Sequence, residues 1–296
     1  MSKIIKLNPF IVRKVWGGDK LHSQTELSSI ENVGELWEVS TLSEGTSTIG
    51  TVPLSDICQL NYLVKFIDTS DNLSIQVHPT DEFANAFENS SGKTECWIIL
   101  DSEAEAGIYL GFKPGVTRKE FFTAIENGLS IESFLNFIPV SPGQFIFVPA
   151  GSIHAIGKGV TLCEVQQSCG LTYRVWDWDR MGLNGKAREL HLEKAKEVLN
   201  FSADFNDTLI NKIYNAFTDN LGVLDLCEHQ DFKVQLFTCH QDKEYELNVI
   251  EKTSLVCLDG SISGDIDLNK LQTGFVLEAG SIKFKASKKT SFLIVC

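Results

Sequence analysis

Several patterns that mark membrane-spanning, secreted or nucleic-acid-binding proteins are absent from this sequence. Its eight cysteines include no CxxC pair, and no apolar run is long enough to cross a bilayer. Basic residues are scarce, 26 against 39 acidic ones, and the resulting net charge of −13 argues against nucleic acid or an anionic membrane as a partner. The opening stretch, MSKIIKLNPFIVRKVWGG, has no apolar signal-peptide core. We therefore predict a cytoplasmic protein.

What the sequence does contain is a succession of short apolar or alternating runs. Hydrophobic residues make up 43% of the chain and charged residues 22%, which is the composition of a folded globular protein. The runs are separated by Gly, Pro, Ser and Asp, and they are GELWEVS, YLVKFI, LSIQVH, ECWIIL, AGIYLGF, QFIFVPA, VTLCEVQQ and LTYRVWDW. Such spacing predicts a mainly β protein, an antiparallel sandwich or barrel.

Helical patterns are few and short. The clearest is TRKEFFTAIENG, in which Thr117 and Glu120 have the spacing of a capping box. A second short helix is predicted over residues 130–137, and residues 186–220 are predicted to form a helical connector. A strand-rich block follows over residues 222–296.

This last block resembles an altered copy of the first. TECWIILDS has a counterpart in TSLVCLDGS, and SPGQFIFVPAGSIH has one in EAGSIKFKASKKTS when Gly143 and Gly280 are set level. Ser254 then stands opposite Glu95, and Ser291 stands opposite His154. We predict that the second copy keeps the β frame and lacks the ligand-type residues.

Polar residues at alternate positions form a candidate metal site. Gln76 and His78 are two positions apart, as are Lys93 and Glu95, so each pair lies on one face of its strand. PGQFIFVPAGSIHAIG is predicted to be a strand, a turn and a return strand that carries His154. The nitrogen and oxygen donors of Gln76, His78, Glu95 and His154 suit Zn²⁺, although Mn²⁺, Fe²⁺ or Co²⁺ would fit the same set. The alternative is the solvated face of an ordinary antiparallel sheet.

Six motifs in order link the sequence to a known family: KFIDTSDNLSIQVHPTDEFA, GKTECWIIL, GIYLGFKPGVTRKEF, VPAGSIHAIGKGVTLCEVQQ, TYRVWDWDR and RELHLEKA. Through them residues 7–200 closely resemble type I mannose-6-phosphate isomerases (phosphomannose isomerases) in a short bacterial form. The resemblance implies the cupin superfamily, with tandem cupin-type jelly rolls and one Zn²⁺ per chain. It divides the chain into a catalytic domain at 1–205 and a degenerate cupin-like β domain at 220–296.

The resemblance also implies roles for individual residues. The family's zinc ligands fall on the four residues found above. Its active-site arginine falls on Arg174, its motif lysine on Lys93, and an acidic residue on Glu164. Larger relatives carry a helical insertion domain where this chain has only short helices between 117 and 137, so no contact from such a domain is predicted here.

The predicted activity is the aldose–ketose isomerisation of mannose 6-phosphate and fructose 6-phosphate through a cis-enediol intermediate. Zinc would polarise the two sugar oxygens as a Lewis acid. Glu164 would take the C2 proton, with zinc-bound water as its rival. Arg174 or Lys93 would stabilise the developing negative charge or bind the phosphate. The partner is a small sugar phosphate, and the sequence does not define an oligomeric state.

Two other protein classes remain open. A noncatalytic cupin that senses a sugar or a sugar phosphate would keep the metal set, but it could dispense with Arg174, Glu164 and Lys93, whose joint presence counts against it. A cupin oxygenase would present an HxH pair to iron, whereas Gln76 stands here in place of the first histidine.

Overall fold

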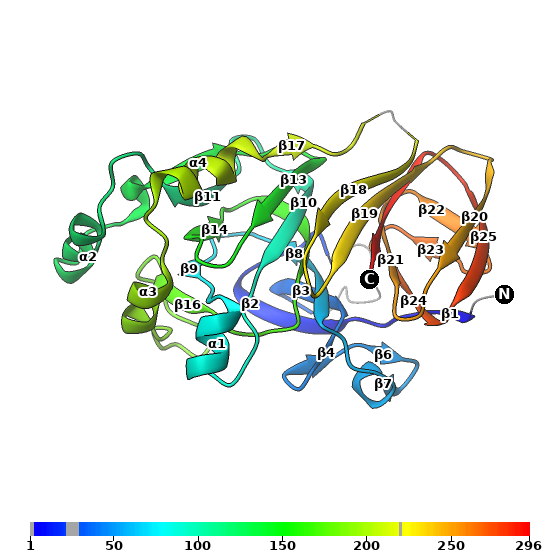
Figure 1. Cartoon of the computed structure of the whole chain (residues 1–296), viewed down its shortest axis with the longest axis horizontal. Coiled ribbons are helices and arrows are strands. Elements are labelled where there is room, and N and C mark those ends of the chain that lie inside the picture. The colour runs from blue at the N-terminus through cyan, green and yellow to red at the C-terminus, as the bar shows by residue number, and fades with distance from the viewer. Residues whose placement is uncertain (1–2, 22–29, 219–220) are drawn as a thin grey trace.

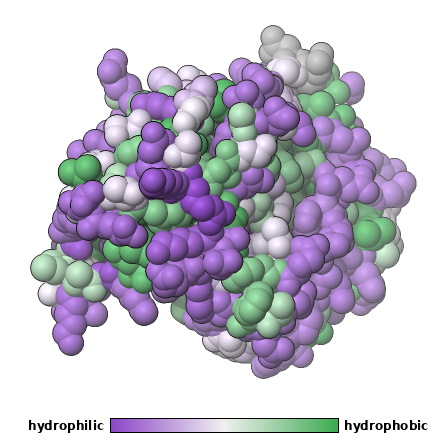
Figure 2. All heavy atoms as spheres, turned by 60° about the vertical axis from the view of Figure 1, so that its left-hand side comes forward, coloured by the Kyte–Doolittle hydropathy of each residue, from purple (hydrophilic) through white to green (hydrophobic). Residues whose placement is uncertain are grey.

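The computed structural model describes residues 3–21, 30–218 and 221–296, and these are built mainly from antiparallel strands. Two β units lie side by side, and the α-helices gather on the unit at the left of Figure 1. Within the described ranges, no helix is long and apolar enough to cross a membrane. Hydrophilic side chains cover most of the face shown in Figure 2, with apolar ones in small groups between them. The mainly β class predicted from the sequence is confirmed.

The first unit consists of two antiparallel sheets with a core between them. The larger sheet has the order β17 (Tyr214–Asn215), β13 (Gln144–Val148), β10 (Glu95–Ser102), β15 (Val160–Gln167), β8 (Tyr62–Asp68), β3 (Val33–Val39), β2 (Phe10–Gly18). The smaller has the order β12 (Leu135–Pro139), β11 (Gly107–Phe112), β14 (His154–Ile156), β9 (Ile75–Val77), β16 (Tyr173–Trp176). Both sheets contribute to one buried apolar cluster, which includes Trp97, Ile146 and Ile108. Each run that was predicted to be a strand forms one.

Two short hairpins accompany this unit, β4 (Thr41–Leu42) with β5 (Gly45–Thr46) and β6 (Thr48–Ile49) with β7 (Val52–Pro53). A 3₁₀ turn, η2 (Leu54–Asp56), follows them.

The second unit also has two sheets. The larger has the order β1 (Lys3–Lys6), β24 (Thr273–Glu278), β21 (Ser254–Asp259), β26 (Thr290–Val295), β19 (Lys233–Cys239), β18 (Gly222–Glu228). The smaller has the order β20 (Glu244–Val249), β25 (Gly280–Ala286), β22 (Ser261–Gly264), β23 (Leu268–Asn269). The first described strand of the chain, β1, therefore completes a sheet made otherwise of the last residues, as Figure 1 shows. No motif in the sequence indicated this pairing.

Strand β10 is buried on both faces, which places its alternate residues in different cores. Trp97 packs between the two sheets of the first unit. Cys96 and Ile98 pack in the cluster that the seven-stranded sheet shares with the second unit, where they join residues such as Leu236 and Val256. The side chain of Glu95 therefore faces the interior of the first unit, because residues two apart share a face.

The second unit repeats the strand order of the first, but in a different alignment from the predicted one. Strand β21 pairs with β24 and β26 as β10 pairs with β13 and β15. The counterpart of β13 is therefore β24. Setting Gly143 level with Gly280, which begins the next strand, is wrong, and so is the pairing of His154 with Ser291. The error arose because short β segments resemble one another whichever strand they form.

Aromatic packing fills the second unit at the position equivalent to the candidate metal site. In the first unit His154 pairs with Leu110 on one side and Gln76 on the other. In the second unit β25 takes the corresponding place between β22 and β20, and its Phe284 pairs with Gly264 and Tyr245. The rings of Tyr245 and Phe284 are stacked with centroids 5.7 Å apart. An apolar core has replaced the polar cluster at this place.

The helices agree only in part with the sequence prediction. Helix α2 (Arg118–Glu126) is present with its complete capping box, because Thr117 and Glu120 each bond the other's backbone N–H. The helix predicted over 130–137 is wrong: a 3₁₀ turn, η3 (Glu132–Phe134), leads directly into β12. Asn136 donates to backbone carbonyls of β11, so pairing with that strand outweighs the local helical pattern.

The remaining helices flank the first unit. Helix α1 (Asp81–Phe87), which was not predicted, begins with Thr80 as its N-cap. Helices α3 (Leu192–Val198) and α4 (Ala203–Asn211) occupy the predicted connector.

Glu38 on β3 is a carboxyl group buried beside the second unit. It is 1% exposed, and its Oε1 has no hydrogen-bond partner among the described residues. Burial raises the pKa of Glu38 to about 8, against the lowering effects of Thr273 and Lys6. The folded chain therefore retains a proton between pH 4.5 and about 8 that the unfolded chain releases. This group makes the protein less stable as the pH rises through that window.

We expect the Glu38→Gln variant to remove this loss. The free energy of unfolding is measured with urea at pH 5, 6, 7 and 8. As the pH rises, the value for the wild type should fall relative to that of the variant, by at most about 1.4 kcal/mol per pH unit. Glu278→Gln, which changes an exposed carboxylate on β24, is the matched control and should follow the wild type. Parallel curves for the wild type and Glu38→Gln would show that Glu38 is ionised in the folded protein.

Candidate metal centre and active site

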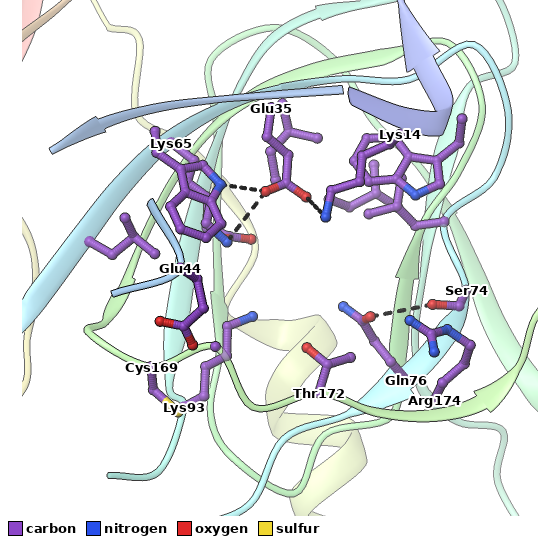
Figure 3. A pocket seen from close by; sticks show the side chains of 18 of the residues that line it. Lys14, Glu35, Glu44, Lys65, Ser74, Gln76, Lys93, Cys169, Thr172 and Arg174 are labelled. Carbon is purple, nitrogen blue, oxygen red and sulfur yellow. Dashed lines mark hydrogen bonds and ion pairs between the residues drawn. The ribbon is translucent and has the colours of Figure 1, made fainter. Parts of the chain in front are cut away.

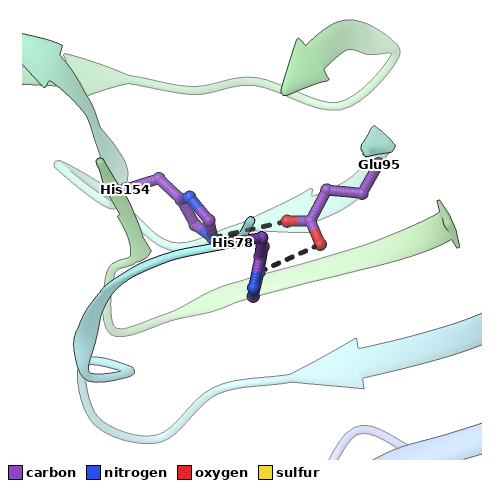
Figure 4. A group of neighbouring side chains, drawn as sticks. All are labelled: His78, Glu95 and His154. Atoms are coloured by element: carbon purple, nitrogen blue, oxygen red, sulfur yellow. Dashed lines mark ion pairs between the residues drawn. The ribbon is translucent and has the colours of Figure 1, made fainter. Parts of the chain in front are cut away.

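Three buried side chains that could hold a metal ion meet inside the first unit (Figure 4). His78 directly follows β9, Glu95 begins β10 and His154 begins β14. The Nε2 atoms of His78 and His154 lie 3.4 Å from Oε2 and Oε1 of Glu95, respectively. Each residue is 1% exposed. No other group of three or more such ligand residues lies this close together in the part of the chain that the structure describes.

The backbone partners of the two histidines determine where their protons lie. Nδ1 of His78 is 2.9 Å from the carbonyl oxygen of Leu171, and Nδ1 of His154 is 3.0 Å from that of Ser152. A carbonyl oxygen only accepts, so each Nδ1 carries a hydrogen and donates it. The Nε2 lone pair of each neutral ring is therefore directed toward Glu95.

This arrangement brings several acceptors together and suits a cation. Neither oxygen of Glu95 receives a hydrogen bond of good geometry from the described residues, although both are buried. Two nitrogen lone pairs and one carboxylate thus converge on one place. Imidazole nitrogen and carboxylate oxygen are ligands that zinc accepts at catalytic sites. The donor set therefore fits a divalent metal ion.

Lys93 supplies the positive charge nearest to the cluster. Its Nζ lies 2.7 Å from Oε2 of Glu95 and 2.9 Å from Nε2 of His78. Burial and the Lys93 charge lower the pKa of His78 to about 3, and burial lowers the pKa of His154. Against the effect of burial, the Lys93 ammonium holds the pKa of Glu95 well below its usual range. At neutral pH the residues therefore have the forms that bind a metal, neutral imidazole and carboxylate.

Gln76, the fourth predicted ligand, lies beside the cluster with its amide nitrogen toward it. Gln76 pairs with His154 across β9 and β14, and its Nε2 donates to Nε2 of His154 at 3.2 Å. Its Oε1 accepts from the hydroxyl of Ser74 at 3.5 Å. An amide nitrogen does not ligate a metal, so a half-turn about the last side-chain bond is needed to present the oxygen. The Gln76 side chain thus lies next to His154, and its amide is turned so that the oxygen accepts from Ser74 and the nitrogen faces the cluster.

A cavity of about 360 Å³ lies next to the cluster (Figure 3). Gln76 and Lys93, which contact the cluster, also line this cavity, and so do the predicted residues Glu164 and Arg174. The charged residues of the lining are five cations and three carboxylates: Lys14, Lys65, Lys93, Arg174, Arg188, Glu35, Glu44 and Glu164. The cavity is thus rich in positive charge, although the whole chain carries a net charge of −13.

Glu164 lies on β15 in a chain of buried charges. Its Oε2 accepts from Nε1 of Trp97 at 3.0 Å, and its Oε1 lies 3.2 Å from Nζ of Lys65. Lys65 also lies 3.9 Å from Glu35, which in turn lies 3.1 Å from Lys14. Burial, and then the charge of Glu95, raise the pKa of Glu164. Against burial, Lys14 and Lys65 lower the pKa of Glu35 to about 2. Of these two carboxylates, Glu164 is the one suited to accept a proton.

Two arginines form another part of the cavity wall. Arg174 on β16 donates from Nη1 to the carbonyl oxygen of Glu189 at 2.8 Å, and its buried Nε has no partner among the described residues. Arg188 donates to both carboxylate oxygens of Asp177. Burial, and then the charge of Arg188, lower the pKa of Arg174. The two guanidinium groups are therefore neighbours, and Arg174 retains an unused donor.

The structure thus brings all seven predicted site residues into one region, and it adds residues that sequence reasoning missed. These are Lys14, Glu35, Lys65 and Arg188. A signal for Lys65 was available: it is the only charged residue in YLVKFI, and its strand is buried along its whole length. A lysine in such a strand must have a buried partner. Lys14 follows another basic residue, Arg13, and Arg188 is flanked by Lys186 and Glu189, so nothing distinguished either from a surface residue.

Comparison with known proteins gives a consistent result. No protein-family model matches the chain. Among curated proteins, the mannose-6-phosphate isomerase of Streptococcus mutans is 34% identical over 228 residues, 70% of this chain and 71% of that protein. The mannose-6-phosphate isomerase ManA of Bacillus subtilis is 37% identical over 210 residues, 64% of this chain and 66% of that protein. The matches therefore span about two thirds of each protein.

Solved structures extend the similarity to the whole chain. The mannose 6-phosphate isomerase from Bacillus subtilis matches with a TM-score of 0.82 and 26% identity over 100% of both chains. The apo form of mannose 6-phosphate isomerase from Salmonella typhimurium matches with a TM-score of 0.70 and 17% identity over 99% of both chains, which is a likeness of fold. The predicted fold class, tandem cupin-type jelly rolls with a few short helices, is confirmed.

Proposed function

Because the chain belongs to the mannose-6-phosphate isomerase family, we propose that it interconverts mannose 6-phosphate and fructose 6-phosphate in the cavity beside His78, Glu95 and His154. The observation that carries this proposal is a buried cluster of metal ligands next to a cavity rich in cations. A cavity of about 360 Å³ falls in the range of small-molecule sites, and its charge suits an anionic sugar phosphate.

We propose further that the cluster binds one Zn²⁺ per chain through His78, Glu95 and His154, with the amide oxygen of Gln76 as the fourth ligand. When bound, zinc would act as a Lewis acid on the sugar oxygens at C1 and C2. Binding would also release the Lys93 ammonium from Glu95 and His78, since the metal takes the same atoms. Lys93 would then be free to face the cavity that it lines.

The remaining steps belong to the chain's own residues. Glu164 is proposed to take the proton from C2 and return it to C1, because burial raises its proton affinity and the Trp97 indole holds it in place. The intermediate is a cis-enediol. Arg174 is proposed to stabilise the negative charge that develops on oxygen, using the unpartnered Nε. Lys65, beside Glu164, stabilises the carboxylate while it is anionic, before it takes the C2 proton and after it has delivered that proton to C1.

The second unit is proposed to contribute no ligand to the metal. Residues 222–296 hold no candidate cluster within the described part of the chain, and aromatic rings occupy the equivalent place. The proposed catalytic domain, residues 1–205, supplies all seven site residues.

The test is a coupled assay that follows fructose 6-phosphate formation from mannose 6-phosphate. We expect turnover by the wild type, loss of turnover on treatment with a chelator, and recovery when zinc is restored. A zinc-containing chain that binds a sugar phosphate without converting it would contradict the isomerase proposal and leave the noncatalytic sensor in its place. Oxygen consumption with iron would point instead to an oxygenase.

A further inference from the structure

A turn of the second unit reaches into the first unit near the metal cluster. This turn joins β18 to β19 and is closed by a hydrogen bond from the N–H of His229 to the carbonyl oxygen of Phe232 at 2.8 Å. Oδ2 of Asp231 accepts from Nε2 of Gln167 at 2.7 Å. The neighbouring Gln230 donates to Oδ2 of Asp81 at 2.8 Å. Two successive side chains of the turn thus bond residues of the first unit.

Gln167 receives this contact at the end of β15, where it is 1% exposed. Its Nε2 also donates to Oδ1 of Asp81 at 3.0 Å. Its Oε1 accepts from the backbone N–H of Thr94 at 2.8 Å, and its own N–H donates to the Thr94 carbonyl oxygen at 3.0 Å. Both amide hydrogens and the amide oxygen of the side chain are therefore engaged. Since the two carboxylates accept the hydrogens, the oxygen must point to Thr94.

Thr94 stands between the two charged residues that meet in the metal cluster, Lys93 and Glu95. The same short segment is held at a second point, because Oδ1 of Asp81 accepts from the backbone N–H of Gly92 at 2.8 Å. Besides the bond from the N–H of Lys93 to the carbonyl oxygen of Pro79, the backbone at residues 92–94 is thus held by Asp81 and Gln167, and both of these are bonded by the turn of the second unit. A displacement here would move the carboxylate on which both histidines converge.

We propose that Asp231 is a positioning residue of the second unit: through Gln167 it holds residues 92–95 in place and thereby sets the affinity of the cluster for its metal ion. This rests on the proposed function in taking His78, Glu95 and His154 as ligands. Asp231 belongs neither to the cluster nor to the cavity lining. Mutating a residue that orients a metal ligand without touching the metal typically lowers metal affinity or activity by about 10- to 100-fold. A second unit without ligands of its own would in this way still support the site.

The experiment measures the zinc affinity of the metal-free protein by competition with a chromogenic chelator. Asp231→Ala removes the acceptor, and we expect the Kd for zinc to rise about tenfold. Asp231→Asn keeps an oxygen that accepts from Gln167, so its Kd should stay within about twofold of the wild type. Asp225→Ala, which changes an exposed carboxylate on β18 paired with Lys233, is the matched control and should not change the Kd.

Two results would overturn the proposal. One is an Asp231→Ala protein with the zinc affinity of the wild type. The other is an Asp231→Asn protein as weak as Asp231→Ala, since this would assign the effect to the charge. Should the alanine variant fail to fold, Asp231→Ser, whose hydroxyl is too short to reach Gln167, makes the same test. Zinc affinity needs no turnover, so a wild type that binds zinc without isomerising its substrate would refute the proposed function and leave this inference standing.

Discussion

Replacing His154 by alanine is expected to abolish stoichiometric metal binding and to lower turnover by more than about a hundredfold, which is beyond the usual cost of losing a residue that only orients a ligand. The physical reason is the geometry of the cluster. His154 supplies the lone pair that faces Oε1 of Glu95, and no further histidine, cysteine or carboxylate among the described residues joins the cluster to replace it. Without His154, only His78, Glu95 and the weakly donating Gln76 are left, and we expect a chelator to remove the metal ion from such a site.

The measurement is elemental analysis of the purified variant together with the coupled assay. His240→Ala, which changes an exposed histidine of the second unit, is the matched control and should retain both metal and turnover. Glu95→Gln preserves the shape of the side chain while removing its charge, and we expect it to lose the metal as well. A His154→Ala protein that retains one equivalent of metal would show that the ligands lie elsewhere.

Replacing Arg174 by alanine is expected to lower kcat by at least about a hundredfold, the scale for losing one preorganised donor of positive charge. Arg174 lines the cavity, and its buried Nε has no partner among the described residues, so its guanidinium is placed to act where negative charge would develop on a bound substrate. Arg118→Ala on the exposed face of α2 is the matched control and should leave kcat unchanged. Steady-state kinetics with both sugar phosphates separate the effect on kcat from that on KM.

An effect confined to KM would contradict this role. It would mean that Arg174 binds ground state and transition state equally, most simply through the phosphate. Lys93 would then be the better candidate for stabilising the enediol. The Lys93→Ala and Arg174→Ala double variant shows whether the two cations share one task, because the effects of groups that act together are not additive.

Local alternation in the sequence was enough to predict the strands of the first unit and to pick out residues that the structure brings together. Gln76 and His78 share a face wherever their strand lies. Glu95 and Cys96 are adjacent in a strand, so their side chains face opposite sides of the sheet. The capping box at Thr117 was likewise predictable, because it involves residues three positions apart. Features of this kind depend on neighbours in the chain and not on the tertiary fold.

What could not be predicted depends on contacts between distant segments. Residues 135–139 form a strand because β11 lies beside them, and β1 joins a sheet made of residues more than 200 positions away. The charge chain from Lys14 to Glu164 crosses several strands, and no local pattern marks its members as a group. The contact of Asp231 with Gln167 spans 64 positions and joins two units that are separate blocks of the sequence.

Titration of the metal-free chain with zinc, with turnover followed at each addition, tests the central proposal most directly. If one metal ion held by Gln76, His78, Glu95 and His154 makes this chain an isomerase, the rate of fructose 6-phosphate formation from mannose 6-phosphate should rise linearly and stop rising at one equivalent of zinc per chain. Full turnover by the metal-free chain, or a rate that keeps rising well past one equivalent, would contradict it.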